Sequence, residues 1–505
     1  MALNIFANFC GKFWLLLISI LAVPVYFAVL TEEAFGLVGF FTVLLATLQV
    51  LEFGLGSVIN REIARTRFTP KSFQHTRDLV RSLEVIYWLL GLLLAGLVYG
   101  AAPFIATQWL NNEHQSAGQV VNALQLMGMI IAFQWPVSLY VGCLTGLERL
   151  VLLNLLQIAF GTLRTGGAIG VLWWVSPTLE AFFVWQLIVA IVAVAGFSIV
   201  CWQILPHRRR SAKFSMATLR SVWRFAMGLG ATGAVTFLLA NLDRLILSKF
   251  ISLTAFGYYN VANQLNAASR MLPAAVFQAL SPRFSQLYAQ EQGRDEELVS
   301  LYHQSSQLIS LMVFPAAMTL ALFSNEILYL WLQNEKVASS AAMIASVLVM
   351  GSALNATLGI PYEMTVARGW SMYGFYQNLV SAAVIVPLML ALVWMYGALG
   401  AAAAWFILNI GYLAVAAPFI ARRTVPRGEL SRWYLQDVGL PLIVCAGVCA
   451  IMRLALPAQE SLLAQLIWIV TSWLLAQLAC LLVLPRIRKP LNQMLRGHFK
   501  KVLWN

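Results

Sequence analysis

Apolar runs of about 20 residues recur along almost the whole of this 505-residue chain, and a run of that length is what a helix needs to cross a bilayer. Hydrophobic residues make up 60% of the chain and charged residues only 10%, and the mean hydropathy is +0.78. Too few polar side chains are present to cover a water-soluble fold of this size. The chain is therefore predicted to be an all-α polytopic membrane protein.

Hydropathy windows place roughly 14 membrane spans along the sequence. They lie at residues 8–30, 36–60, 82–106, 118–142, 149–175, 180–204, 221–250, 255–280, 300–323, 338–362, 372–396, 398–420, 434–455 and 461–484.

The loops between these spans differ in charge. When alternate loops are assigned to the cytoplasm, starting with the N-terminus, 27 of the 33 Lys and Arg residues fall on the cytoplasmic side, and only Lys336 lies in an outer loop. Cytoplasmic loops carry this excess of basic residues, so both termini are predicted to be cytoplasmic. The net charge of +13 then reflects topology and an anionic inner leaflet. Nucleic acid is disfavoured as a partner, since the basic runs lack interleaved aromatic residues.

Residues typical of catalysis and metal binding are scarce. The chain has four Asp residues and no DxD, Walker A or HExxH motif. Its six cysteines lie in or beside apolar segments without CxxC spacing, which favours small buried side chains over metal ligands. No catalytic residue, metal site or cofactor is predicted, and an enzyme is disfavoured.

One short motif occurs twice. Ala-Phe-Gly stands at residues 34–36, before the second span, and again at 255–257, before the eighth. The first six spans and the next six are therefore interpreted as two lobes related by a parallel repeat, which is typical of transporters that alternate access around a central cavity. The predicted parts are an N-terminal lobe at 1–205, a basic linker at 206–220, a C-terminal lobe at 221–421, and two extra helices with a basic tail at 422–505.

Three segments carry a resemblance to a known family. "AFGLVGFFTVLLATLQVLEFGLGSVINREIA" (34–64), "LANLDRLILSKFISLTAFGYYNVANQL" (239–265) and "FSNEILYLWL" (323–332) are similar to the Wzx-type O-antigen flippases. These belong to the polysaccharide-exporter branch of the multidrug/oligosaccharidyl-lipid/polysaccharide (MOP) flippase superfamily. Many relatives have Asp where this chain has Glu52.

The resemblance implies a function. A protein of this family moves undecaprenyl-diphosphate-linked oligosaccharide from the cytoplasmic to the periplasmic leaflet of a bacterial inner membrane, for O-antigen, capsule or exopolysaccharide assembly. A polysaccharide polymerase and a chain-length regulator are then expected partners. Two members of the same superfamily are alternatives, a lipid II flippase and a multidrug or cation antiporter. An alternative of another class is a non-transporting partner of a polysaccharide synthase.

Such a substrate needs cations for its diphosphate and polar groups for its glycan. The predicted cations are Arg270, Arg164, Arg61 and Lys12, because guanidinium forks bind phosphate oxygens bidentately. The alternatives are that Arg61 and Lys12 mark the membrane interface and that Arg164 and Arg270 pair with acids or carbonyls. The predicted glycan contacts are polar residues within spans, which could instead form interhelical hydrogen bonds. They are Asn154, Gln157, Asn260, Asn263, Gln264, Asn266, Asn355 and Asn378.

Acidic residues inside the spans suggest gating or ion coupling. Asp243 and Arg244 are predicted to lie near the outer mouth of the cavity, where Asp243 holds a cation of the other lobe or forms a static salt bridge. Glu52, Glu84 and Glu363 are further candidates for binding a coupling ion. Coupling to a proton gradient, a sodium gradient or the membrane potential stays open.

Overall fold

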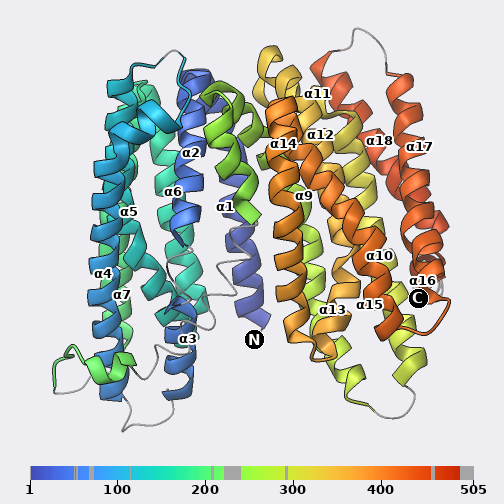
Figure 1. The fold of residues 1–505 in the computed structure, drawn as a ribbon, viewed down its shortest axis with the longest axis horizontal. Helices are drawn as coiled ribbons and strands as arrows, with labels where there is room; N and C mark the ends of the chain where they lie inside the picture. Colours follow the sequence, from blue (N-terminus) through green and yellow to red (C-terminus); the bar gives the residue numbers. More distant parts are fainter. Residues whose placement is uncertain are drawn as a thin grey trace, which may run out of the picture. The chain divides into compact units, whose positions relative to one another are not determined.

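The computed structural model of the chain describes residues 2–49, 52, 55–66, 73–113, 115–205, 210–220, 240–290, 294–456 and 461–489 (Figure 1). Within these residues every regular element is a helix, apart from one isolated bridge between Asn111 and Ser252. Most of the predicted span at 221–250 and most of the basic tail lie outside the described residues. Contacts divide the chain into two compact units, Met1–Gly257 and Tyr258–Asn505.

The first unit is a bundle of long helices. Its core is apolar side chains of α3, α4, α5 and α7, among them Leu83, Tyr87, Leu139 and Cys143, all fully buried. Its elements are α1 (Ala2–Val29), α2 (Glu32–Gln49), α3 (Leu55–Thr66), α4 (Phe73–Phe104), η3 (Ile105–Trp109), α5 (Ala117–Gly146), α6 (Leu150–Trp174), α7 (Leu179–Ile204) and the helical residues 240–250.

The stretch 240–257 lies in the first unit, where it contacts the end of η3 and the residues that follow it. Trp109 Nε1 donates a hydrogen bond of 3.1 Å to Ser248 Oγ, and the Lys249 ammonium reaches the Gln108 carbonyl. Leu253 N donates to Asn111 O at 3.1 Å. The contact boundary after Gly257 therefore differs from the repeat boundary, and the lobes predicted at 1–205 and 221–421 stay a prediction.

The second unit has its own core, which includes Phe284, Tyr302, Ile309 and Trp433. Its elements are α9 (Leu253–Tyr288, which begins in the first unit), α10 (Arg294–Leu322), α11 (Ser324–Leu332), α12 (Glu335–Thr357), α13 (Gly359–Ala367), α14 (Ser371–Gly411), η4 (Tyr412–Ala416), α15 (Ala417–Thr424), α16 (Glu429–Arg432), η5 (Trp433–Gly439), α17 (Leu440–Leu454) and α18 (Leu462–Val483).

Ten helical stretches in the described part are long and apolar enough to cross a membrane. Eleven of the predicted spans lie in them, because the predicted spans 372–396 and 398–420 form one stretch, Met372–Thr424. Gly397, with φ 55° and ψ −132°, breaks that stretch where the sequence predicts a turn. The predicted span 255–280 is a helix, α9, whose first half is rich in amides.

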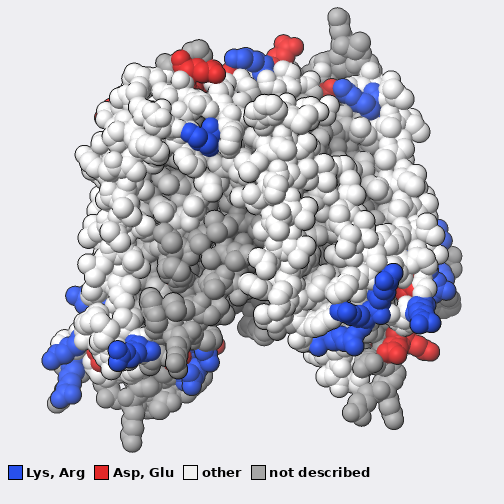
Figure 2. Space-filling model, viewed as in Figure 1, with Lys and Arg blue, Asp and Glu red and all other residues white. Residues whose placement is uncertain are grey.

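Charged side chains gather at the two ends of the helices of each unit, and the middle of the visible face is almost free of them (Figure 2). Many large apolar side chains of the long helices are exposed. On α4 they include Leu89, Leu92 and Leu97, each about 60% exposed, and Ile443 of α17 is 69% exposed. An uncharged belt with apolar side chains turned outward is what a lipid environment requires.

Candidate functional site

A cavity of about 550 Å³ lies within the first unit, between α1, α2, α5, α6 and α7. It brings together several residues that the sequence predicts to be functional: Lys12 of α1, Gln157 and Arg164 of α6, and Glu52, which lies between α2 and α3. Its other lining residues are Leu15, Leu45, Leu48, Ile131, Gln134, Trp135, Val137, Ser138, Val141, Phe160, Gly161, Val189, Ala190, Ala193 and Phe197.

The two cations of this cavity lie on adjacent helices. Arg164, near the middle of α6, and Lys12 of α1 both have exposed side chains. In the part of the chain that the structure describes, neither has an ion-pair partner. A cation at membrane depth is expensive unless it meets a counter-charge or water, so this cavity is suited to an anionic ligand.

Close packing of α1 on α6 places both cations in one wall. A Cβ built on Gly11 would lie 2.8 Å from Asn154 Oδ1, so glycine leaves room for this side chain between the two helices. Trp14 Nε1 donates to Thr162 Oγ1 at 2.8 Å. These contacts hold α1 and α6 together next to the two cations.

Glu52 supplies the acid of the cavity. Its Oε1 accepts a hydrogen bond of 2.7 Å from the hydroxyl of Tyr87, which is fully buried in α4. The remaining polar lining is neutral, from Gln134, Ser138 and Gln157, and the other walls are apolar. A cavity with two cations, one carboxylate, a few hydrogen-bonding groups and apolar walls has the composition of a small-ligand site.

Other predicted residues of the first unit lie outside this cavity. Asn154 is buried, and its Nδ2 donates to the Leu150 carbonyl at 2.7 Å, which makes it part of the α1–α6 packing. Arg61 is exposed on α3. Asp243 and Arg244 are half-buried in the helical residues 240–250. The predicted roles of these four residues in substrate binding and gating stay predictions.

Glu84 is a member of a hydrogen-bond network in the first unit's core. It accepts bonds from the Tyr140 hydroxyl at 2.5 Å and from Arg81 Nη1 at 2.6 Å. Trp202 Nε1 donates a third, at 3.3 Å. Arg81 lies on α4, Tyr140 on α5 and Trp202 on α7. The Glu84 carboxylate therefore links these three helices.

In the second unit, the predicted residues lie on four helices. Arg270 is exposed on α9, and Asn263 of the same helix is buried. Asn260 and Gln264 of α9 and Asn378 of α14 are half-buried. Glu363 of α13 is half-buried, and among the described residues its Oε2 has no hydrogen-bond partner. Asn355 of α12 donates to Asn409 Oδ1 at 2.7 Å, the interhelical bond that the sequence left open as an alternative.

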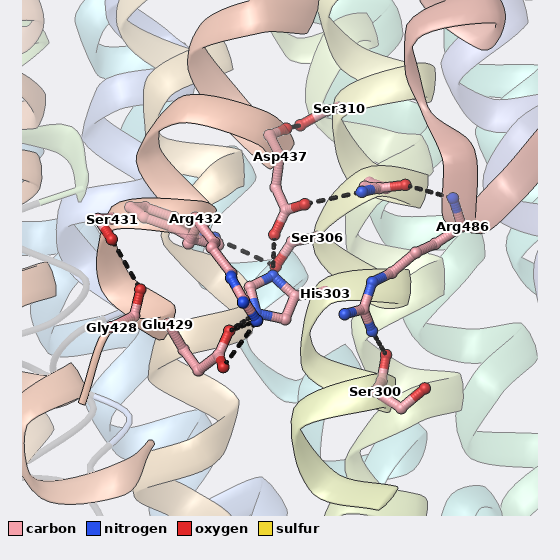
Figure 3. A network of polar contacts seen from close by, with 12 residues as sticks. Ser300, His303, Ser306, Ser310, Gly428, Glu429, Ser431, Arg432, Asp437 and Arg486 are labelled. Carbon is pink, nitrogen blue, oxygen red and sulfur yellow. Dashed lines mark hydrogen bonds and ion pairs between the residues drawn. The ribbon is translucent and has the colours of Figure 1, made fainter. Parts of the chain in front are cut away.

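A second polar cluster was not predicted, and it joins α10 to the last helices (Figure 3). His303 lies between two carboxylates: its Nδ1 contacts Asp437 of η5, and its Nε2 lies 2.9 Å from Glu429 of α16. Gln307 Nε2 donates to Asp437 Oδ1 at 2.8 Å, and the backbone N–H of Arg486 donates to Gln307 Oε1 at 3.0 Å. His303, Gln307 and Asp437 are all at most 2% exposed.

The π-helical turn η5 produces this geometry. Its wide turn directs both Asp437 and Trp433 at α10, where Trp433 Nε1 donates to Ser306 Oγ at 3.1 Å. The available sequence signal was the spacing of polar residues on α10, since His303, Ser306, Gln307 and Ser310 recur at helical intervals on one face.

The described residues form helices long and apolar enough to cross a membrane, and one helical unit encloses a cavity that carries two cations. This architecture is suited to a membrane transporter. Residues 1–288 match the sequence model of the family described as "Polysaccharide biosynthesis protein". Because this match covers more than half of the chain, the chain belongs to that family.

Individual relatives agree with this assignment. A Shigella flexneri protein, provisionally named an O-antigen transporter, is 23% identical over 387 residues, which is 75% of this chain and 87% of that protein. The lipid II flippase MurJ in its inward closed conformation has a TM-score of 0.68 at 13% identity, covering 94% of this chain and 98% of its own. An inward-facing multidrug MATE transporter of the MOP superfamily has a TM-score of 0.65 at 13% identity, covering 80% and 93%.

These matches confirm the predicted fold class and the predicted family. The chain is a member of this polysaccharide-biosynthesis family, and its helical membrane fold is the fold of the MurJ and MATE structures. The two structural likenesses concern the fold alone, since both are at 13% identity.

Proposed function

We propose that this chain is a flippase for undecaprenyl-diphosphate-linked oligosaccharide, which it moves from the cytoplasmic to the periplasmic leaflet by alternating access. The glycan would serve O-antigen, capsule or exopolysaccharide assembly. The observation that carries the proposal is Arg164, an exposed guanidinium in the middle of a membrane helix, inside a cavity and without an ion-pair partner among the described residues. A diphosphate is the counter-charge that such a group would accept.

The cavity contains groups that suit both the diphosphate and the glycan of the proposed substrate. The Arg164 fork can bind two phosphate oxygens at once, and Lys12 adds a second cation. Gln134, Ser138 and Gln157 can hydrogen-bond sugar hydroxyls. The volume of about 550 Å³ lies in the usual range of small-ligand sites, so it would take the diphosphate and the first sugars, while the polyprenyl tail stays in lipid.

The other predicted residues keep their roles as parts of this proposal. Arg61 and Arg270 would contact the diphosphate, and the amides of α9 and α14 would contact the glycan, at other stages of transport. Asp243 and Arg244 would close the outer gate, and Glu52 or Glu363 would bind a coupling ion. Alternating access would use the two predicted lobes, 1–205 and 221–421. A polysaccharide polymerase and a chain-length regulator are the proposed partners.

The proposed location is the bacterial inner membrane with both termini in the cytoplasm. It is supported by the distribution of basic residues, of which only Lys336 falls in a predicted outer loop. Reporters fused after Arg210 and at Lys501 should both report cytoplasm, and one at Lys336 should report periplasm. A periplasmic signal after Arg210 would overturn the predicted topology.

Deletion of the gene in its native host tests the function. The proposal predicts that a lipid-linked oligosaccharide accumulates with its glycan on the cytoplasmic side, and that the wild-type chain restores export. Rescue of a strain depleted of its lipid II flippase would instead favour that alternative, and drug resistance would favour an antiporter. A non-transporting synthase partner needs no hydrated cavity, so an Arg164→Cys variant that a water-soluble thiol reagent cannot label would favour that class.

A further inference from the structure

A second pocket, of about 670 Å³, lies within the second unit where α13 and α15 end and α10 begins. Three arginines line it: Arg368, which follows α13, and Arg422 and Arg423 in the last turn of α15. All three side chains are exposed. Figure 2 shows Lys and Arg side chains gathered at the lower end of this unit, where Figure 1 places the end of α15.

The charge of this pocket is unbalanced. Among its twelve lining residues Asp295 is the one acid, so three guanidinium groups face a single carboxylate. Within the described residues, Arg368 and Arg422 have no ion-pair partner. Like charges this close repel one another, and an anion between them would relieve that repulsion.

Arg423 is held in place by stacked aromatic rings. Its guanidinium lies 4.2 Å from the ring centre of Phe419 and 5.0 Å from that of Trp370. Trp370 also stacks on Tyr373, with centroids 5.7 Å apart. A guanidinium fixed by its planar face keeps its N–H edge free for an anion. Aromatic residues in such a group are typical of the membrane–water interface.

The neighbouring surface is apolar. Val366 of α13 is 46% exposed, Met372 of α14 is 54% exposed, and Phe419 of α15 is 42% exposed. An anion at the arginines could therefore carry hydrocarbon chains that lie on this surface. A free phosphate has no hydrocarbon chain, so this apolar surface would not strengthen its binding.

We propose that the pocket lined by Arg368, Arg422 and Arg423 binds the phosphate of an anionic phospholipid of the surrounding leaflet. Basic pockets at the ends of membrane helices are suited to such headgroups. This site is separate from the transport cavity and does not depend on the substrate proposed for it. The alternative is that the arginines only complement the negative ends of α13 and α15, which would give no preference for anionic lipid.

Native mass spectrometry of the full chain, released from nanodiscs of phosphatidylglycerol and phosphatidylcholine, tests the proposal. Wild-type protein should retain phosphatidylglycerol preferentially. Each Arg→Gln change at 368, 422 or 423 should weaken that retention roughly fivefold, and the triple variant should lose it. The matched control is Arg210→Gln/Lys213→Gln/Arg220→Gln, which removes three exposed charges from the first unit and should retain the lipid.

Three results would overturn the proposal. Equal retention of the two lipids by wild-type protein would do so, as would equal losses in the triple variant and its control. Inorganic diphosphate that binds the lipid-free protein and displaces phosphatidylglycerol would reassign the pocket to a soluble anion. The triple Arg→Lys variant keeps the charges, so retained lipid there would show that loss in the Arg→Gln variant comes from charge and not from misfolding.

Discussion

Gly36 of α2 and Gly257 of α9, the glycines of the two Ala-Phe-Gly motifs, lie against each other within the first unit. A Cβ built on Gly257 would lie 3.1 Å from the Glu32 carbonyl oxygen and 3.5 Å from Gly36 N, and one built on Gly36 would collide with the Leu253 carbonyl oxygen. The two copies of the motif therefore meet, and glycine is the residue that this approach of two backbones allows.

The substitution Gly36→Ala should destabilise the protein by about 1–3 kcal/mol, because backbone atoms must move to admit the new methyl group. The measurement is the Tm of the purified protein. Gly96→Ala on α4 is the control, since nothing lies within 4 Å of a Cβ there and alanine is the better helix former. Equal Tm values for the two variants would contradict the close contact.

The cluster around His303 predicts a different kind of stability loss. Asp437→Asn should lower the free energy of unfolding by about 3 kcal/mol, because it removes the buried one of the two carboxylates that contact His303. The double variant with His303→Gln should lose less than the sum of the two single losses. Arg432→Gln, which breaks an exposed pair with Glu429, should change stability by about 1 kcal/mol or less. Additive losses for His303 and Asp437 would rule out the pairing.

Substitutions at Tyr87 and at Glu52 distinguish a structural role of their hydrogen bond from a role of Glu52 in ion coupling. Tyr87→Phe should cost about 1 kcal/mol of stability, because water in the cavity can replace the lost donor. Glu52→Gln should leave stability unchanged but remove any response of transport to an imposed proton or sodium gradient in proteoliposomes. Glu180→Gln, at an exposed position, is the control for loss of an acid. An unaltered gradient response in Glu52→Gln would exclude this carboxylate as the coupling site.

Arg270 tests the proposed contact in the second unit. Arg270→Ala should reduce export at least tenfold at normal abundance, since a diphosphate contact is worth more than 1.4 kcal/mol. Arg270→Lys should restore part of it, because the ammonium keeps the charge without the fork. Arg283→Ala, an exposed arginine of the same helix, is the control. Normal export by Arg270→Ala would remove this residue from the substrate path. Rescue by neutralising an acid as well would make it a structural partner.

Span positions followed from the sequence because lipid imposes a length and a composition on each helix. The predicted span 180–204 corresponds to α7, Leu179–Ile204, and 461–484 to α18, Leu462–Val483. Part of the cavity lining could also be predicted, because a cation or an amide inside an apolar run is expensive in lipid and therefore indicates a polar site. Lys12, Gln157 and Arg164 were singled out in this way, and the structure brings them together.

The His303 cluster could not be predicted by the same reasoning. Its partners Glu429 and Asp437 lie 126 and 134 residues further along the chain, so only packing brings them together. The π-helical turn that aims Asp437 at α10 has no sequence signature. The arginine pocket could not be predicted for a related reason. In the sequence its three arginines have the pattern of ordinary interfacial charge, and only the packing of two helix ends brings them together: Arg368, Arg422 and Arg423.

The central claim, that the cavity of the first unit binds the diphosphate of the substrate, depends on Arg164. Arg164→Ala removes the guanidinium of the cavity, whereas Arg149→Ala removes an exposed one at the start of the same helix and serves as the control. Arg164→Lys keeps the charge and should retain part of the activity. Both alanine variants should insert normally, because losing a charge makes membrane insertion easier.

The most direct measurement is flipping in proteoliposomes that contain undecaprenyl-diphosphate-linked oligosaccharide labelled on its glycan, with an added glycosidase reporting the glycan that reaches the outside. Wild-type protein and Arg149→Ala should expose the glycan over time, and Arg164→Ala should be at least tenfold slower at equal protein content. Equal rates for Arg164→Ala and wild type, or no exposure by wild-type protein of any lipid-linked glycan from its own host, would contradict the account.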